Sequence, residues 1–147
     1  MLTINEYRKV ESLEEAYELN QKKNNKIIAG GVWMKIGDRR IATAIDLSGL
    51  GLDQITETDT EFVIGAMTTL REIEKHAGLA AYTDGAIRES VRHIVGVQFR
   101  NLATIGGSIF GRFGFSDVLT CFLALDTEVE LYKGGIISLE EFAKMER

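Results

Sequence analysis

The 147-residue chain contains no proline, one cysteine and two histidines, and the shortage of metal-binding residues excludes whole classes of site. Cys121 has no second cysteine with which to form a disulfide, and such sparse use of cysteine is compatible with a reducing cytoplasm. One cysteine and two histidines far apart in the sequence cannot build a cysteine-rich zinc or iron–sulfur centre. We therefore expect no metal centre in this chain.

Long hydrophobic runs are also missing, so the sequence predicts no membrane span. The first 15 residues lack a basic region followed by an apolar core, and we expect no secretory signal. The net charge is -5, with 17 basic against 22 acidic residues, which argues against a nucleic-acid-binding protein. These features together predict a cytoplasmic protein.

Helical and strand-like patterns alternate along the chain, which predicts a mixed α and β fold in two small lobes. Capping patterns or apolar spacing predict helices that begin near Ser12, Thr69, Asp84, Asp117 and Ser138. The expected strands cover residues 26–29 (buried), 43–47, two segments around the polar turn at 58–60, and 127–132.

Two glycine pairs, Gly30-Gly31 and Gly106-Gly107, each follow a short apolar segment. Adjacent glycines can adopt positive φ and present consecutive backbone N–H groups to one anion, most often a phosphate. Thr104 and Ser108 would add hydroxyl donors beside the second pair. Two such turns could hold both halves of a pyrophosphate, although tight turns at strand ends are the simpler explanation of either pair taken alone. The spacing fits neither a P-loop nor the Rossmann fingerprint.

Four blocks carry a more specific signal: KIIAGGVWMKIG, AIDLSGL, FVIGAMTTLREIE and VRHIVGVQFRNLATIGGSIFGRFGFSDV. In this order they resemble the FAD-binding subunit or domain of molybdenum hydroxylases, a family that includes xanthine and carbon monoxide dehydrogenases. The resemblance extends over nearly the whole chain. It implies an α+β, two-lobed FAD-binding fold of the PCMH/vanillyl-alcohol-oxidase type. Residues 1–50 would form a small βαβ-like lobe, and residues 51–147 a second lobe with a mixed or antiparallel sheet.

The resemblance also implies a cofactor site in which the two glycine turns wrap the FAD pyrophosphate and an aspartate binds polar groups of the cofactor. The residues so implied are Ile28, Ala29, Gly30, Gly31, Val32, Trp33, Met34, Thr104, Ile105, Gly106, Gly107, Ser108 and Asp117. No residue is expected to act as an acid, base or nucleophile. Val32 and Trp33 stand where family members often carry a small hydroxyl residue.

The implied function is an electron-transfer subunit of an oxidoreductase complex. An iron–sulfur subunit and a molybdopterin subunit would be its partners, and an acceptor such as NAD would take the electrons. The family's C-terminal domain has no counterpart in the sequence, which is expected for a fragment or a shortened member. Two alternatives stay open: an assembly module of the same complex that binds no flavin, and an unrelated α+β binding domain.

Three residues near the glycine turns allow two interpretations each. Arg100 and Arg112 flank this turn and could neutralise phosphate charge or pair with a partner subunit. Trp33 could stack on a cofactor ring or pack in the core. Cys121 is expected to be a small core residue.

Overall fold

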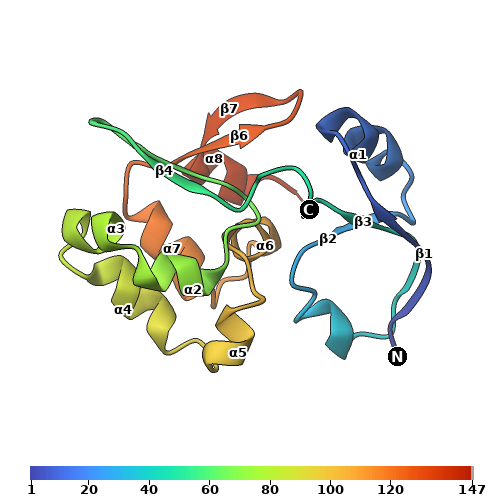
Figure 1. Cartoon of the computed structure of the whole chain (residues 1–147), viewed down its shortest axis with the longest axis horizontal. Coiled ribbons are helices and arrows are strands. Elements are labelled where there is room, and N and C mark those ends of the chain that lie inside the picture. Colours follow the sequence, from blue (N-terminus) through green and yellow to red (C-terminus); the bar gives the residue numbers. More distant parts are fainter. Residues whose placement is uncertain (147) are drawn as a thin grey trace.

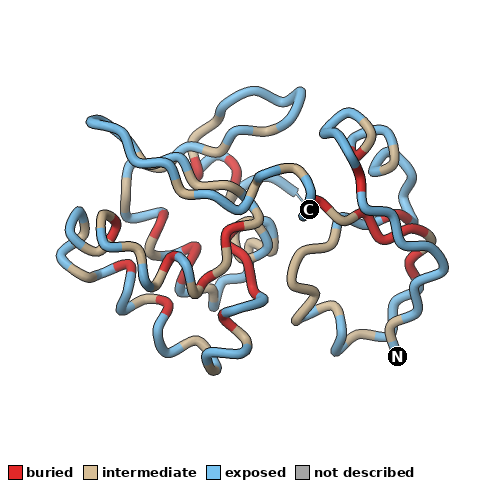
Figure 2. Tube along the Cα trace, in the orientation of Figure 1, coloured by how far each residue is buried: buried red, intermediate tan, exposed pale blue. Residues whose placement is uncertain are grey.

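The computed structural model describes residues 1–146 and contains two groups of elements that lie side by side. Figure 1 shows a parallel-sheet part, built from the first strands and helix, next to a helical part built from the rest of the chain. Figure 2 shows that the buried residues likewise form two separate groups. The architecture agrees with the predicted two-lobed arrangement of helices and strands.

The parallel-sheet part contains β1 (Thr3–Lys9), α1 (Leu13–Asn20), β2 (Lys26–Ile28) and β3 (Arg40–Asp46). The three strands run parallel in the order β1-β3-β2, so β3 is central. The core of the parallel-sheet part consists of Val10, Ala16, Ile45 and Leu47. Strand β1 was not predicted, because all seven of its residues are exposed and show no apolar alternation.

The predicted burial of the strand at residues 26–29 is wrong. Lys26 and Ile27 are exposed, because β2 is an edge strand and only one of its sides pairs with β3. Residue 29 lies outside the strand, which ends at Ile28.

The helical part begins with an antiparallel hairpin, and a second antiparallel hairpin lies near its end, just before the last helix. Between these hairpins, helices that contain buried Ile73, Val91 and Val118 form the larger core. A 3₁₀ turn, η1 (Met34–Ile36), precedes β3 in the parallel-sheet part. The elements of the helical part are β4 (Ile55–Glu57), β5 (Phe62–Ile64), α2 (Leu70–Lys75), α3 (Ala77–Tyr82), α4 (Ala86–Arg92), α5 (Val97–Arg100), α6 (Ile105–Gly111), α7 (Asp117–Leu123), β6 (Glu128–Leu131), β7 (Gly135–Ser138) and α8 (Leu139–Lys144).

Side-chain caps fix where several helices begin. Ser12, Thr69 and Ser138 each accept a hydrogen bond from the backbone N–H three residues on, as the capping patterns predicted. The predicted cap at Asp117 is wrong by one residue. Ser116 is the N-cap of α7 and Asp117 is its first helical residue, because the Ser116 hydroxyl accepts from Leu119 N–H.

The tip of the β6–β7 hairpin contacts α1, and this contact joins the two parts of the molecule (Figure 1). The Tyr132 hydroxyl donates to Glu14 Oε2 over 2.7 Å, and Lys133 Nζ donates to Glu14 Oε1 over 2.6 Å. The same ammonium group lies 4.5 Å from the centroid of the Tyr17 ring. We call these four residues the hairpin contact. Hydrogen bonds from Lys133 and Tyr132 lower the pKa of Glu14 below its ordinary value.

This pKa shift predicts a pH dependence of stability. Because the Glu14 pKa is lower in the folded state, its stabilising effect is complete above the pKa of the unfolded chain, about 4.3. The effect is lost as the pH falls through the folded pKa. Between pH 6 and pH 3, wild type should therefore lose more stability than Glu14→Gln, as measured by urea unfolding. The change is expected to be small and to shrink in high salt, because the pair is exposed.

Glu18→Gln is the matched control, since Glu18 lies on the same helix and makes no side-chain hydrogen bond within residues 1–146. It should follow wild type across the pH range. Parallel curves for wild type and Glu14→Gln would show that the hairpin contact does not stabilise the fold.

Candidate functional site

The first glycine turn packs directly against the backbone that precedes the second glycine pair. A Cβ atom on Gly30 would overlap the carbonyl oxygen of Leu102 and lie 3.0 Å from the backbone nitrogen of Ala103. Only glycine permits this approach without a shift of one backbone. The structure thus brings together two segments about 70 residues apart in sequence, one from each part of the molecule.

The turn after Gly30 leaves consecutive backbone donors available. Gly31 has φ +66°, in the left-handed region that favours glycine. Within residues 1–146, the N–H groups of Gly31, Val32 and Trp33 donate to no acceptor, whereas Gly31 accepts from Lys35 N–H over 3.0 Å. Neighbouring unpaired N–H groups in such a turn are a typical anion-binding arrangement. The turn with consecutive free N–H groups that the sequence predicts is therefore present at the first glycine pair.

The second glycine pair does not form the predicted turn. Gly106 and Gly107 lie inside α6, neither has positive φ, and Thr104 is the N-cap. The backbone N–H groups here are already paired: Ile105 donates to Thr68 O, Gly106 to Ala66 O, Gly107 to Thr104 Oγ1 and Ser108 to Thr104 O. The expectation of free N–H groups at this pair is therefore wrong, because a cap and the 66–68 backbone use them.

Close packing explains the glycine at position 106. A Cβ atom there would lie 2.8 Å from the Ala66 Cβ and closer still to the Ala66 carbonyl oxygen. Gly107 is exposed, and a Cβ on it would meet only Thr104 Oγ1, at 3.2 Å. The Ser108 hydroxyl donates to Thr104 O over 3.0 Å, so it is engaged within the helix.

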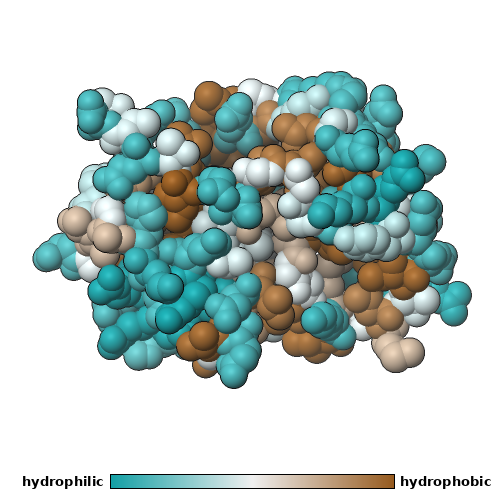
Figure 3. Space-filling view, viewed as in Figure 1, coloured by the Kyte–Doolittle hydropathy of each residue, from teal (hydrophilic) through white to brown (hydrophobic). Residues whose placement is uncertain are grey.

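Aromatic rings surround the first glycine turn. The Trp33 ring centroid lies 6.2 Å from that of Phe99 and 6.1 Å from that of Phe115, which itself stacks on Phe113. Trp33 is 58% exposed and Phe115 is 69% exposed, so both rings keep open surface. Of the two interpretations of Trp33, core packing is therefore wrong. Figure 3 shows hydrophobic side chains reaching the surface along the middle of the molecule.

The contact between Gly30 and the Leu102 backbone is called the Gly30 junction below. The remaining candidate residues lie on either side of this junction. Ile28 is the last residue of β2, and Ala29 and Met34 flank the glycine turn, half-buried. Asp117 is exposed at the start of α7, two residues after Phe115. Phe99, Leu102 and Phe115 also belong to the junction. No sequence signal pointed to Leu102, because its contact uses only the backbone.

Arg100 points into the protein rather than toward a phosphate or a partner subunit at the surface. Its side chain is buried, and Nε donates to Glu74 Oε2 over 2.8 Å. Arg112 lies between two rings, 4.6 Å from the centroid of Phe142 and 5.4 Å from that of Phe110. Cys121 is half-buried against the helical core, as predicted.

Residues 1–146 contain neither a candidate metal-binding cluster nor a candidate membrane-spanning helix. These residues hold no group of three or more His, Cys, Asp or Glu side chains that could bind a metal ion. None of their helices is both long and apolar enough to span a membrane.

The chain matches the model of one known protein family over nearly its whole length. Residues 3–147 match the model of the FAD-binding domain in molybdopterin dehydrogenase. The chain therefore belongs to this family, which confirms the predicted family and the predicted cofactor, FAD.

Among curated proteins, the chain is similar to the uncharacterized protein YgfM of Escherichia coli K12. The two are 30% identical over 147 residues, which cover 95% of this chain and 54% of YgfM. The chain thus spans about half the length of the curated relatives it matches.

Solved structures show the same fold. A Cu,Mo-CO dehydrogenase chain superposes with TM-score 0.81 at 26% identity, covering 95% of this chain and 52% of that chain. The carbon monoxide dehydrogenase of Hydrogenophaga pseudoflava gives TM-score 0.79 at 27% identity, over 90% and 49% of the two chains. Quinoline 2-oxidoreductase from Pseudomonas putida 86, at 20% identity and TM-score 0.78 over 91% and 50%, shares the fold. The predicted fold class is confirmed.

The two glycines of α6 give a paired test of this geometry. Gly106→Ala should destabilise the protein by about 1–3 kcal/mol, because the new methyl group would force the Ala66 backbone away. Gly107→Ala should change stability by less than about 1 kcal/mol, because the gain in helix propensity opposes one tight contact. Urea unfolding of both variants measures the difference. Equal effects would contradict the packing described for Gly106.

Proposed function

We propose that this chain is the FAD-binding electron-transfer subunit of a molybdenum-containing hydroxylase or dehydrogenase complex. In this proposal an iron–sulfur subunit and a molybdopterin subunit are its partners, an acceptor such as NAD receives the electrons, and the complex works in the cytoplasm. Residues 1–50 and 51–147 would be the two FAD-binding lobes. The observation that carries the proposal is the set of unpaired N–H groups at Gly31–Trp33, in a chain of the FAD-binding family.

The residues around the first glycine turn fit a dinucleotide. Unpaired N–H groups of Gly31, Val32 and Trp33 would bind the pyrophosphate, which compensates for the hydroxyl residue that is missing at positions 32 and 33. Thr104 accepts a hydrogen bond from Gly107 N–H through Oγ1 and keeps its own hydroxyl proton to donate. The remaining predicted site residues, Ile28 to Gly30, Met34, Ile105 to Ser108 and Asp117, would line or support the same site.

Bound FAD would supply the redox chemistry, and the protein would supply position and electrostatics. Trp33 and Phe115 are both more than half exposed, so a planar ring could contact them next to the proposed phosphate-binding turn. Gly30 holds this turn against the Leu102 backbone, so the two parts of the chain would bind one ligand together.

Flavin binding is tested by titrating the purified chain with FAD and following Trp33 emission. Trp33 is the single tryptophan in the sequence, so every change in emission reports on this turn. FAD bound beside it should quench the emission strongly, since flavin absorbs at the wavelengths where tryptophan emits. ADP should compete with FAD, because both contain the pyrophosphate, and FMN should compete poorly.

The control is Gly31→Val, which places a β-branched side chain at φ +66°, where nothing lies within 4 Å of the new Cβ. It should weaken FAD binding by disturbing the turn without disturbing the core. A wild-type chain that takes up no FAD, alone or with its partner subunits, would refute the proposed function.

A further inference from the structure

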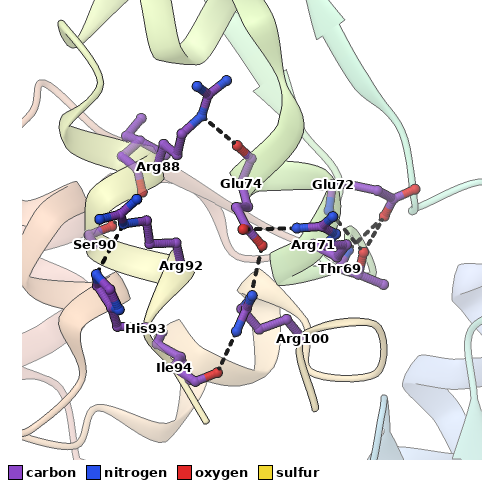
Figure 4. Close-up of polar contacts among 11 residues, drawn as sticks. Thr69, Arg71, Glu72, Glu74, Arg88, Ser90, Arg92, His93, Ile94 and Arg100 are labelled. Atoms are coloured by element: carbon purple, nitrogen blue, oxygen red, sulfur yellow. Dashed lines mark hydrogen bonds and ion pairs between the residues drawn. The ribbon is translucent and has the colours of Figure 1, made fainter. Parts of the chain in front are cut away.

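Arg100 is the one charged side chain buried in residues 1–146, with 6% of its surface exposed. Its Nε donates to Glu74 Oε2 over 2.8 Å, and its Nη1 donates to the carbonyl oxygen of Ile94 over 3.1 Å (Figure 4). Glu74 lies on α2, whereas Arg100 ends α5. The guanidinium group therefore ties α5 and the segment before it to α2.

Glu74 binds a second cation on its outer side. Arg71 Nη1 lies 2.8 Å from Glu74 Oε1, and the Arg71 side chain is considerably more exposed than that of Arg100. The two arginines thus share one carboxylate, and Arg100 also donates a hydrogen bond to the carbonyl oxygen of Ile94 (Figure 4). Replacing one arginine at a time can therefore distinguish the effect of removing a cation from Glu74 from the effect of releasing α5.

The segment that Arg100 fixes continues directly to the first glycine turn. Ala103 N–H donates to Phe99 O over 2.8 Å, and Leu70 N–H donates to Ala103 O over 2.8 Å. These bonds hold Leu102 between α5 and α2. The Leu102 carbonyl is the group against which Gly30 packs.

The same turn of α5 also supports Trp33. Phe99, next to Arg100, lies edge-on to the Trp33 ring with a centroid distance of 6.2 Å. Leu102 O and the Phe99 ring are therefore two contacts between the first glycine turn and the 99–103 segment. Both depend on where α5 lies relative to α2.

We propose that Arg100 is a positioning residue for the dinucleotide site. Through its bonds to Glu74 and Ile94 it fixes Phe99 and Leu102, and these in turn fix the turn that carries the unpaired N–H groups of Gly31–Trp33. Its effect on FAD affinity rests on the function proposed above. Its effect on the position of Trp33 does not.

The test compares Arg100→Met with Arg71→Met, each of which removes one of the two cations on Glu74. In Arg100→Met the 99–103 segment should move, Trp33 emission should shift to longer wavelength, and acrylamide should quench it more readily. The Kd for FAD should rise about tenfold or more, since a displaced turn misplaces its donors. Arg71→Met should leave Trp33 emission unchanged and the Kd within about twofold of wild type.

Loss of stability alone must be separated from loss of position. Leu79→Ala, in the core at α3, should lower the melting temperature without changing Trp33 emission or FAD affinity at temperatures where the chain is folded. Arg100→Lys keeps the charge but loses the planar fork, so it should fold and show an intermediate Trp33 shift. If Arg100→Met does not fold, the Trp33 emission and FAD affinity of Arg100→Lys test the positioning role instead.

Each outcome has one interpretation. A folded Arg100→Met or Arg100→Lys with wild-type Trp33 emission, quenching and FAD affinity would overturn the positioning role. A changed Trp33 signal in a chain whose wild type binds no FAD would support the positioning role and refute the proposed function. A changed Trp33 signal with weakened FAD binding would support both.

Discussion

The approach of Gly30 to the Leu102 carbonyl is the contact on which the candidate site depends. It is a backbone-to-backbone contact, so neither side can yield by changing a rotamer. It also joins the parallel-sheet part to the helical part at the point where the unpaired N–H groups begin. A side chain at position 30 would push the turn away from the helical part and separate the two halves of the site.

The hairpin contact joins the same two parts at a different place, through polar and cation–π interactions rather than through backbone packing. It consists of an exposed ion pair, a tyrosine hydrogen bond and a cation over a ring, all of which are weakened by water and salt. The Gly30 junction, in contrast, rests on packing and on a buried ion pair behind it. We therefore expect the junction to set the geometry of the site, and the hairpin contact to adjust how firmly the two parts stay together.

Local signals predicted the elements that local chemistry determines. The hydroxyl caps at Ser12, Thr69 and Ser138 were readable because a cap and its partners lie within one turn of helix. The β4–β5 hairpin was readable because the polar turn at residues 58–60 separates two short strand-like segments. The exposed strand β1 was not, since its residues lack the alternation of a half-buried strand.

Misassignments arose where a distant segment decides the outcome. Gly106-Gly107 has the composition of a turn, yet Thr104 caps a helix there and Ala66, 40 residues earlier, accepts the Gly106 N–H. Arg100 has the appearance of a phosphate ligand beside a glycine turn, yet Glu74 neutralises it inside the protein. In both cases the expected ligand-binding group is satisfied by the chain itself.

Because of these internal partners, the two glycine pairs have different structural roles. The second pair lets α6 pack against the 66–68 backbone, and so serves as a rigid support. The first pair has both roles: Gly30 packs against that support, and Gly31 turns the chain so that the next N–H groups stay unpaired. The glycines that come close to backbone are thus distinct from the glycine that opens the binding turn. The proposed phosphate-binding site would therefore depend on one turn with unpaired N–H groups, held in place by buried contacts, rather than on two equivalent turns.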